Sequence, residues 1–221
     1  MESQALRAEP FNLIIAGVGG QGNVLASRVV GSMLSQKGYT VTIGETFGGT
    51  QRGGSVMSHL RISSHRSYSP VIPKAKAHLI VALEPIEAVR LLKDFGNPDV
   101  RILCNMRPIH PVQVISGELQ YPSLDDVRSW VTELTGQAWF VNATDLALEL
   151  GARILGNIIM LGALAGTGVL PLERTALESY LSTQLPAGKL PANLAAYDRG
   201  MALVWGSAPP VNLPRPTGAK I

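Results

Sequence analysis

Short runs of consecutive apolar residues alternate with segments of helical periodicity through the first part of the chain. Residues 11–16 (FNLIIA) form such a run, which is typical of a strand buried on both faces of a parallel sheet. Residues 23–37 repeat apolar side chains at helical spacing, and Gly38 follows as a helix-terminating glycine. The alternating, β-branched residues 39–43 (YTVTI) predict the next strand, so this region is expected to complete a βαβ unit.

The alternation of strand-like and helix-like segments continues to about residue 150. Further strands are predicted at 55–62, 78–83, 100–104 and 138–141, and helices at 85–95, 123–134 and 145–150. Residues 105–121 contain prolines and are expected to form either a crossing loop or a small hairpin. The pattern predicts an α/β fold, a Rossmann-like doubly wound layer with a mostly parallel sheet.

The composition changes after Gly151, where strand-like segments stop. Helices are predicted at 154–165, 172–185 and 194–205, and the last 14 or so residues are rich in proline, which cannot continue a helix. We therefore divide the chain into an N-terminal extension, an α/β domain, a C-terminal helical part packed on it and a Pro-rich tail. The predicted bounds are 1–10, 11–150, 151–206 and 207–221.

The overall composition narrows the class of protein. The 221 residues are 46% hydrophobic and 16% charged, which excludes a disordered chain. The net charge of +3 is too small for a dedicated nucleic-acid surface. The most apolar run, 154–170, is interrupted by glycines and is too short to span a membrane. The first ten residues lack the apolar core of a signal peptide, so a cytoplasmic location is expected.

The residues that bind metals and iron–sulfur clusters are nearly absent from the sequence. Cys104 is the only cysteine, whereas an iron–sulfur cluster needs about four thiolates and a structural zinc site a similar set of Cys or His. The four histidines show no metal-binding spacing, and no phosphate-binding P-loop motif is present. Cys104 lies in an apolar run without an activating base, so no catalytic residue and no metal ligand is predicted.

A glycine-rich turn links the first predicted strand to the first predicted helix. Gly17, Gly19 and Gly22 form the pattern G-x-G-x-x-G, with Gly20 and Gln21 inside it. Such glycines permit a tight turn, close approach of a pyrophosphate and close packing of helix on strand. The helix N-terminus then offers free N–H groups to an anion. The turn is therefore expected either to bind a phosphate group or to serve packing alone.

A second glycine-rich segment begins after the second predicted strand. Glu45 is placed where a nicotinamide dinucleotide would need an acid for its ribose hydroxyl. The segment continues through Gln51, Arg52 and Gly53, which an ordinary dinucleotide-binding fold does not need. The guanidinium of Arg52, among flexible glycines, suits a phosphate or carboxylate, although a solvated turn or a contact with another subunit explains it as well.

Three further polar residues have both functional and structural interpretations. Glu84 follows a buried strand, where ligands of α/β sheets bind, but an acid before Pro85 is also a good helix start. Asn105 occupies the same place after another strand and suits either a ligand contact or a turn. Asn157 lies inside an apolar helix and is expected to find a partner in a nearby loop or subunit.

Several sequence blocks together carry a resemblance to a known family. The runs GVGGQGNVLASRVV, GETFGGTQRGGSVMSHLRIS, SPVIPKAKAHLIVALEP and NIIMLGALAG resemble the gamma-type module of 2-oxoacid:acceptor oxidoreductases. The resemblance covers residues 11–205 and points to the small subunits of indolepyruvate:ferredoxin oxidoreductases. The combination of GxGGQG with QRGG about thirty residues later is specific, although each motif alone is weak.

The resemblance implies a role within a larger enzyme. Members of the family oxidise a 2-oxoacid with coenzyme A to an acyl-CoA and carbon dioxide, and pass the electrons to ferredoxin or another acceptor. Thiamine diphosphate and [4Fe-4S] clusters would lie on a large partner subunit, and the two chains would form an αβ hetero-oligomer. No nucleic-acid partner and no membrane association is expected. This chain would bind no cofactor alone and would be inactive alone.

The resemblance also suggests that the turn at residues 17–22 and Arg52 lie near coenzyme A. Together with the residues of the second glycine-rich segment, the candidate cofactor-binding residues are Gly17, Gly19, Gly20, Gln21, Gly22, Glu45, Gln51, Arg52 and Gly53. Two alternatives stay open from the residues alone. One is an independent NAD(P)-dependent oxidoreductase that uses Glu45, and the other is a non-catalytic assembly module whose glycine turn only packs.

Overall fold

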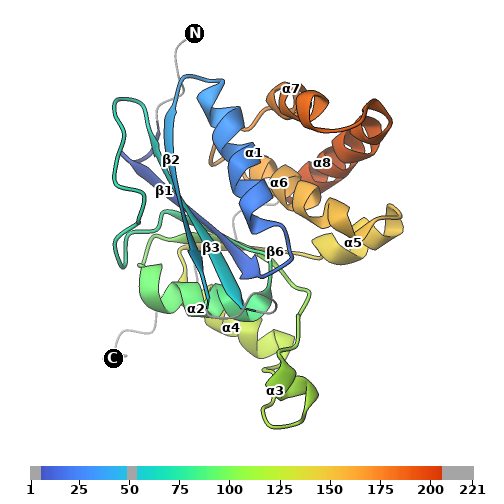
Figure 1. The fold of residues 1–221 in the computed structure, drawn as a ribbon. Helices are drawn as coiled ribbons and strands as arrows, with labels where there is room; N and C mark the ends of the chain where they lie inside the picture. The colour runs from blue at the N-terminus through green and yellow to red at the C-terminus, as the bar shows by residue number, and fades with distance from the viewer. Residues whose placement is uncertain (1–5, 49–53, 206–221) are drawn as a thin grey trace.

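The computed structural model describes residues 6–48 and 54–205 and contains one six-stranded sheet in that part of the chain (Figure 1). The strand order is β2-β3-β1-β4-β5-β6. The strands are β1 (Phe11–Val18), β2 (Thr40–Phe47), β3 (Ser55–Ser63), β4 (Leu79–Ala82), β5 (Arg101–Asn105) and β6 (Gln137–Val141). β1, β4, β5 and β6 pair in parallel, which confirms the predicted mostly parallel α/β sheet.

The antiparallel strand β3 lies between β1 and β2, which the sequence did not predict. Phe11 of β1 pairs with Ile62 of β3, and Thr40 of β2 pairs with Ser63. β1 and β2 therefore run in the same direction but are not hydrogen-bonded to each other. The third strand, β3, is inserted between the two strands of the expected βαβ unit. Leu60 and Ile62 are completely buried, because β3 is covered as a central strand.

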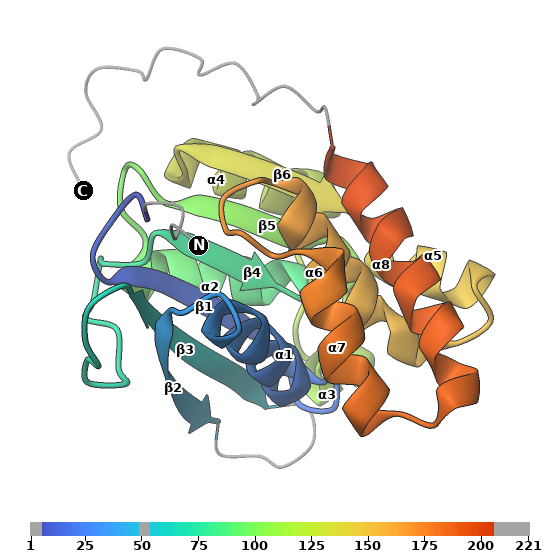
Figure 2. The same cartoon turned by 90° about the horizontal axis from the view of Figure 1, so that it is seen from above.

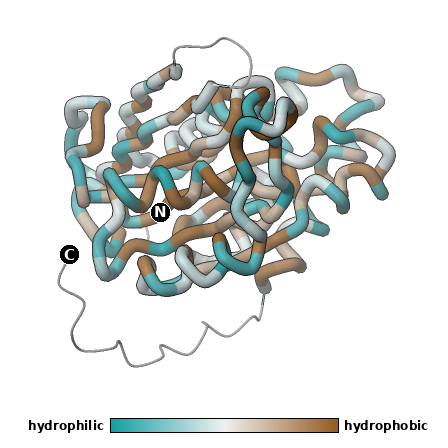
Figure 3. Tube along the Cα trace, turned by 90° about the horizontal axis from the view of Figure 1, so that it is seen from below, coloured by the Kyte–Doolittle hydropathy of each residue, from teal (hydrophilic) through white to brown (hydrophobic). Residues whose placement is uncertain are grey.

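Helices cover both faces of the sheet (Figures 1 and 2). One face carries α1 (Asn23–Ser35), α5 (Ala143–Glu149), α6 (Gly156–Gly166), α7 (Arg174–Gln184) and α8 (Leu190–Val204), and the other carries α2 (Pro85–Phe95) and α4 (Leu124–Leu134). Alternate residues of β1 point to the two layers: Leu13 and Ile15 pack under α1, and Ile14 packs with α2 and α4. The trace coloured by hydropathy shows apolar stretches through the middle of the molecule (Figure 3).

The predicted C-terminal helical part is present and is built around the apolar helix α6. Helix α6 packs tightly against α8, where a Cβ on Gly162 would lie 2.0 Å from the Tyr197 carbonyl oxygen. A Cβ on Gly200 would lie 2.0 Å from the Ile159 carbonyl oxygen, so both helices need glycine where they meet. Short 3-10 turns precede α6 and α8, at Arg153–Leu155 and Ala187–Lys189.

Residues 105–121 are a crossing segment with one short helix, α3 (Val112–Ile115), and no hairpin. The proline-rich tail 207–221 lies outside the described residues. In the part of the chain that the structure describes, the helices are all too short or too polar to cross a membrane.

The lowered pKa values of two buried histidines indicate that the fold is less stable in acid. Burial lowers the pKa of His59 and, with a smaller effect of Lys76, that of His78 below the usual 6.5. His78 Nδ1 accepts the Asn12 N–H at 2.8 Å, and this bond is lost when the ring is protonated. Because both pKa values are lower in the folded state, the stabilisation is present above pH 6.5 and lost as the pH falls below it.

We therefore expect the free energy of unfolding, measured in urea, to fall between pH 7.5 and 5.5. In His78→Asn the amide oxygen still accepts the Asn12 N–H and does not titrate, so the fall is smaller. The same substitution at the exposed His65 is the control for replacing a histidine by an asparagine elsewhere on the chain. A pH dependence that is equal in His78→Asn and the unmodified chain would contradict this account.

Candidate functional site

The glycine turn lies at the carboxyl edge of the parallel strands, between β1 and α1. Gly22 is the N-cap of α1 with φ 80°, and Gly20 has φ 93°, both in the left-handed region that favours glycine. The first helical bond runs from the Ala26 N–H to the Gly22 carbonyl. No side chain caps the helix, so the N–H groups of the first turn, residues 23–25, have no helical or capping acceptor. These N–H groups and the helix dipole suit an anion.

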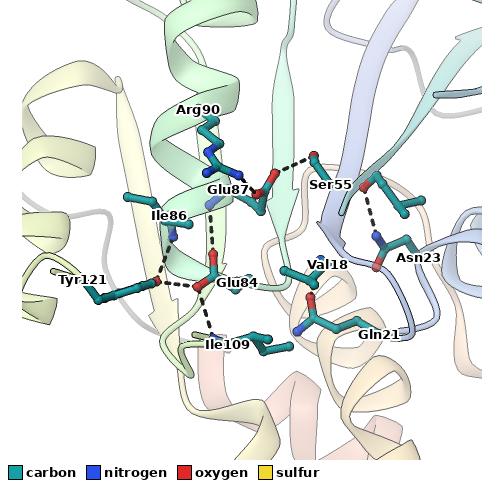
Figure 4. A network of polar contacts seen from close by, with 11 residues as sticks. Val18, Gln21, Asn23, Ser55, Glu84, Ile86, Glu87, Arg90, Ile109 and Tyr121 are labelled. Carbon is teal, nitrogen blue, oxygen red and sulfur yellow. Dashed lines mark hydrogen bonds and ion pairs between the residues drawn. The ribbon is translucent and has the colours of Figure 1, made fainter. Parts of the chain in front are cut away.

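The side chain of Gln21 holds this turn to the sheet. Its Oε1 accepts the Val18 N–H at 2.7 Å (Figure 4). Its Nε2 donates to the Leu83 carbonyl at 2.9 Å, so the side chain joins the ends of β1 and β4. A Cβ on Gly17 would lie 2.4 Å from Gln21 Oε1, so this bridge requires glycine at position 17. The Gln21 side chain is therefore engaged within the protein.

The glycine segment after β2 ends beside the same turn. The Gly19 N–H donates to the Gly54 carbonyl at 2.8 Å, and the Gly48 N–H donates to the Ser55 carbonyl at 2.7 Å. The candidates Gln51, Arg52 and Gly53 lie outside the described residues. The two ends of their segment are nevertheless fixed at the carboxyl edge, with Gly54 bonded directly to the turn.

Glu45 lies within β2, where it pairs with Ser58, and not beyond the end of the strand as expected. Its side chain is exposed on the edge strand of the sheet. In a dinucleotide-binding fold the corresponding acid ends the strand next to β1. Here β3 occupies that position, so the sheet order gives no support to the use of Glu45 on a ribose.

Helix α6 brings Asn157 against the glycine turn. A Cβ on Gly22 would lie 2.0 Å from Asn157 Nδ2, so the amide rests directly on this glycine. Asn157 thus contacts a neighbouring loop, but among the described residues no hydrogen bond of its amide to that loop is found, so its expected polar partner stays a prediction. Beside it, buried Asn23 donates to the Val56 carbonyl at 2.9 Å, while its Oδ1 has no hydrogen-bond partner among the described residues.

A completely buried carboxylate follows β4 at the same edge. Glu84 is the N-cap of α2, and its Oε2 accepts the Glu87 N–H at 3.0 Å. Its Oε1 accepts the Ile109 N–H at 3.3 Å and the hydroxyl of Tyr121, which itself accepts the Ile86 N–H at 3.2 Å (Figure 4). Burial raises the pKa of Glu84, and these bonds partly oppose that rise. The carboxylate thus fixes both the start of α2 and the segment 106–123.

The neighbouring polar side chains are also engaged in structural bonds. Ser55 Oγ donates to Glu87 at 2.6 Å, and Arg90 pairs with the same carboxylate at 2.6 Å. Asn105 donates to the Leu83 carbonyl at 3.1 Å and to Thr144, and accepts the Ala143 N–H. These contacts support the structural interpretations of Glu84 and Asn105.

The structure shows contacts of Tyr121 and Glu87 that sequence reasoning missed. Glu87 stands three residues after Glu84, a spacing typical of a helix start that would have indicated its position. Tyr121 lies 37 residues from Glu84, and the sequence carries no signal for their contact. Cys104 is completely buried and burial raises its pKa, so the thiol is inert. Among the described residues no group of three His, Cys, Asp or Glu is placed to hold a metal ion.

The close contact at Gly22 leads to a stability prediction. Gly22→Ala places a Cβ at a left-handed position and against Asn157, so we expect a loss of about 1–2 kcal/mol from the backbone alone, plus a contribution from the clash. The double variant Gly22→Ala, Asn157→Ala should recover only the part due to the clash. Denaturant unfolding of both variants and of Asn157→Ala gives the two contributions, and unchanged stability in Gly22→Ala would contradict the geometry.

Comparison with known proteins identifies relatives over nearly the whole chain. A family model described as pyruvate ferredoxin/flavodoxin oxidoreductase matches residues 12–203. The indolepyruvate oxidoreductase subunit IorB of Pyrococcus horikoshii is 34% identical over 192 residues, 86% of this chain and 94% of the relative. The gamma subunit of the NADH-dependent phenylglyoxylate dehydrogenase of Aromatoleum evansii is 33% identical over 85% of this chain and 90% of its own.

Solved structures show the same fold. The pyruvate oxidoreductase subunit PORC of Thermotoga maritima has a TM-score of 0.67 at 22% identity, over 88% of this chain and 97% of its own. The 2-oxoglutarate:ferredoxin oxidoreductase of Magnetococcus marinus, solved with 2-oxoglutarate, coenzyme A and succinyl-CoA bound, has a TM-score of 0.70 at 21% identity. That match covers 90% of this chain but only 31% of the Magnetococcus chain.

The family model and the IorB relatives agree with the sequence blocks that carry the resemblance. The relatives of this length are all named as single subunits of 2-oxoacid oxidoreductases. We conclude that this chain belongs to the pyruvate ferredoxin/flavodoxin oxidoreductase family.

Proposed function

We propose that this chain is the small subunit of an indolepyruvate or related aryl 2-oxoacid:ferredoxin oxidoreductase. The enzyme would convert a 2-oxoacid and coenzyme A to an acyl-CoA, carbon dioxide, a proton and two electrons for ferredoxin or another acceptor. The proposal is supported by the 33–34% identity to IorB subunits over 86% of this chain. It is further supported by the phenylglyoxylate dehydrogenase subunit, because phenylglyoxylate is also an aryl 2-oxoacid.

The redox chemistry is assigned to a large partner subunit. A [4Fe-4S] cluster takes four thiolates, and this chain offers only Cys104, which is completely buried. Thiamine diphosphate, on the partner, supplies the carbanion chemistry of decarboxylation. We therefore expect an αβ hetero-oligomer in which this chain is required but inactive alone.

The contribution of this chain is to bind a phosphate group of coenzyme A. The observation that carries this assignment is the uncapped N-terminus of α1 at the glycine turn, where the N–H groups of residues 23–25 have no helical acceptor. The negative charge of a phosphate is stabilised by these donors and by the helix dipole. One end of the segment that contains Arg52 adjoins the turn, so its guanidinium is the proposed second contact.

The requirement for this chain is tested by reconstitution. A large subunit of the proposed kind, carrying thiamine diphosphate and clusters, is assayed with indolepyruvate, coenzyme A and ferredoxin in the presence and absence of this chain. We expect CoA-dependent turnover only when both chains are present, and none with this chain alone. Full turnover by the large subunit alone would overturn the proposal.

The phosphate site is tested at Leu25, which lies in the first turn of α1 and is 46% exposed. Leu25→Glu adds a negative charge that the helix dipole favours by about 0.3–1 kcal/mol, so the fold is retained. The same charge repels a phosphate, and we expect the KM for coenzyme A to rise several-fold while the 2-oxoacid KM is unchanged.

Leu25→Gln is the matched neutral control. It has the same shape without the charge and should leave the KM for coenzyme A within about twofold of the unmodified enzyme. Equal KM values in the Glu and Gln variants, in a complex that assembles normally, would favour the alternative in which the turn serves packing alone.

A further inference from the structure

The segment 106–123, here called the α3 arm, exposes an unusual group of apolar side chains. Val112 is 76% exposed, Ile115 74% and Leu119 60%. No residue of helix α3 is buried. Single exposed apolar residues are common on proteins, but three within eight residues on one short projection are a candidate for an interface.

The arm is internally ordered by hydrogen bonds. The N–H groups of Ile115 and Ser116 donate to the carbonyls of Pro111 at 3.1 Å and Val112 at 2.8 Å, and the Leu119 N–H donates to Gln113 at 2.9 Å. These bonds close the arm on itself, so its apolar side chains are presented in a fixed arrangement. A preorganised surface loses less conformational entropy on binding than a flexible one.

The base of the arm is attached to the sheet through Glu84. This buried carboxylate accepts the Ile109 N–H on the chain that enters the arm and the Tyr121 hydroxyl on the chain that leaves it. The rings of His110 and Tyr121 are in edge contact with their centroids 5.2 Å apart, which joins the two ends of the arm directly. Glu84 thus determines where the arm points.

The arm stands at the same edge of the sheet as the glycine turn. It follows β5 directly, and the carboxyl ends of β1, β4 and β5 meet at this edge. In Figure 1 helix α3 projects away from the two helical layers. A protein bound to the arm would therefore lie next to the proposed coenzyme A site.

The charges of the arm favour a protein partner. Residues 108–117 (PIHPVQVISG) contain no Lys, Arg, Asp or Glu, and the cores of protein interfaces are depleted of charge in the same way. Surfaces that bind membranes are typically rich in Lys and Arg, which this tip lacks. Glu118, at the side of the tip, is held by the Ser116 hydroxyl at 3.0 Å.

We propose that the α3 arm docks into an apolar recess on the large subunit and that Glu84 is the positioning residue for this contact. The inference rests on the proposed function, because it specifies how the small subunit is held. In the Magnetococcus enzyme this fold forms 31% of a longer chain, whereas a separate chain has to be retained by a noncovalent interface.

The test measures the affinity of the two subunits by titrating labelled small subunit with the holo large subunit. The variant Val112→Ser, Ile115→Ser, Leu119→Ser should bind at least about a hundredfold more weakly, since removal of each interface anchor weakens binding several-fold or more. These side chains are exposed, so thermal unfolding of the variant should match that of the unmodified chain. At saturating small subunit its kcat should be restored.

The matched control replaces two apolar residues at the opposite edge of the sheet. Val71 is 58% exposed and Leu134 is 50% exposed, and both lie near the amino ends of the strands. Val71→Ser, Leu134→Ser should bind like the unmodified chain. Tyr121→Phe, which removes one bond to Glu84 and leaves the tip intact, should weaken binding less than the tip variant.

The possible results separate the inference from the function on which it rests. Binding by the tip variant within threefold of the unmodified chain would overturn the docking role of the arm and leave the proposed function standing. Failure of the unmodified chain to bind the large subunit would overturn the proposed function itself. Loss of self-association, with unchanged binding to the large subunit, would show that a second copy of this chain occupies the arm.

Discussion

The bridge made by the Gln21 side chain is the interaction on which the candidate site depends. Its amide accepts the Val18 N–H and donates to the Leu83 carbonyl, so it ties the ends of two adjacent parallel strands together. The bridge fills the space above Gly17 and leaves no room for a Cβ there. It orients the chain so that α1 begins at Asn23, directly after Gly22, with its first N–H groups uncapped at the carboxyl edge of the sheet.

Two carboxylates, those of Glu84 and Glu87, lie at this edge and would repel a bound anion if they faced it. Glu84 is completely buried and accepts three hydrogen bonds, and Glu87 is paired with Arg90 and Ser55. Their oxygen atoms are thus used in holding α2, β3 and the α3 arm. The N–H groups at the start of α1, in contrast, have no acceptor within the helix or from a capping side chain, which is why we place the phosphate there.

Much of the fold could be predicted from the sequence because local pattern determines the elements. The buried strand at residues 11–16, the glycine turn and the helix from Asn23 are specified by neighbouring residues. The position of β3 could not be predicted in the same way, since its alternating pattern suits an edge or a central strand equally well. The contact of Glu84 with Tyr121 is another case, because a hydrogen bond between residues 37 positions apart leaves no periodic signal.

The position of the glycine turn between β1 and α1 was predicted, whereas the contacts of the individual side chains were not. Gln21 and Glu45 were both expected to face a ligand, but Gln21 bonds to the sheet and Glu45 lies on the exposed edge strand. The glycines gave the location because a left-handed turn before a helix leaves few sequence choices. The direction of each side chain depends on which strand lies next to it in the sheet, and the order of the strands is set by tertiary structure.

Hydrogen exchange of the backbone N–H groups at the start of α1, in the assembled enzyme with and without coenzyme A, tests the central claim most directly. If a phosphate is held by the N–H groups of residues 23–25, coenzyme A slows their exchange, and the α1 C-terminus around Ser35 is unaffected. Unchanged exchange at these residues, at a coenzyme A concentration that saturates turnover, would contradict the account.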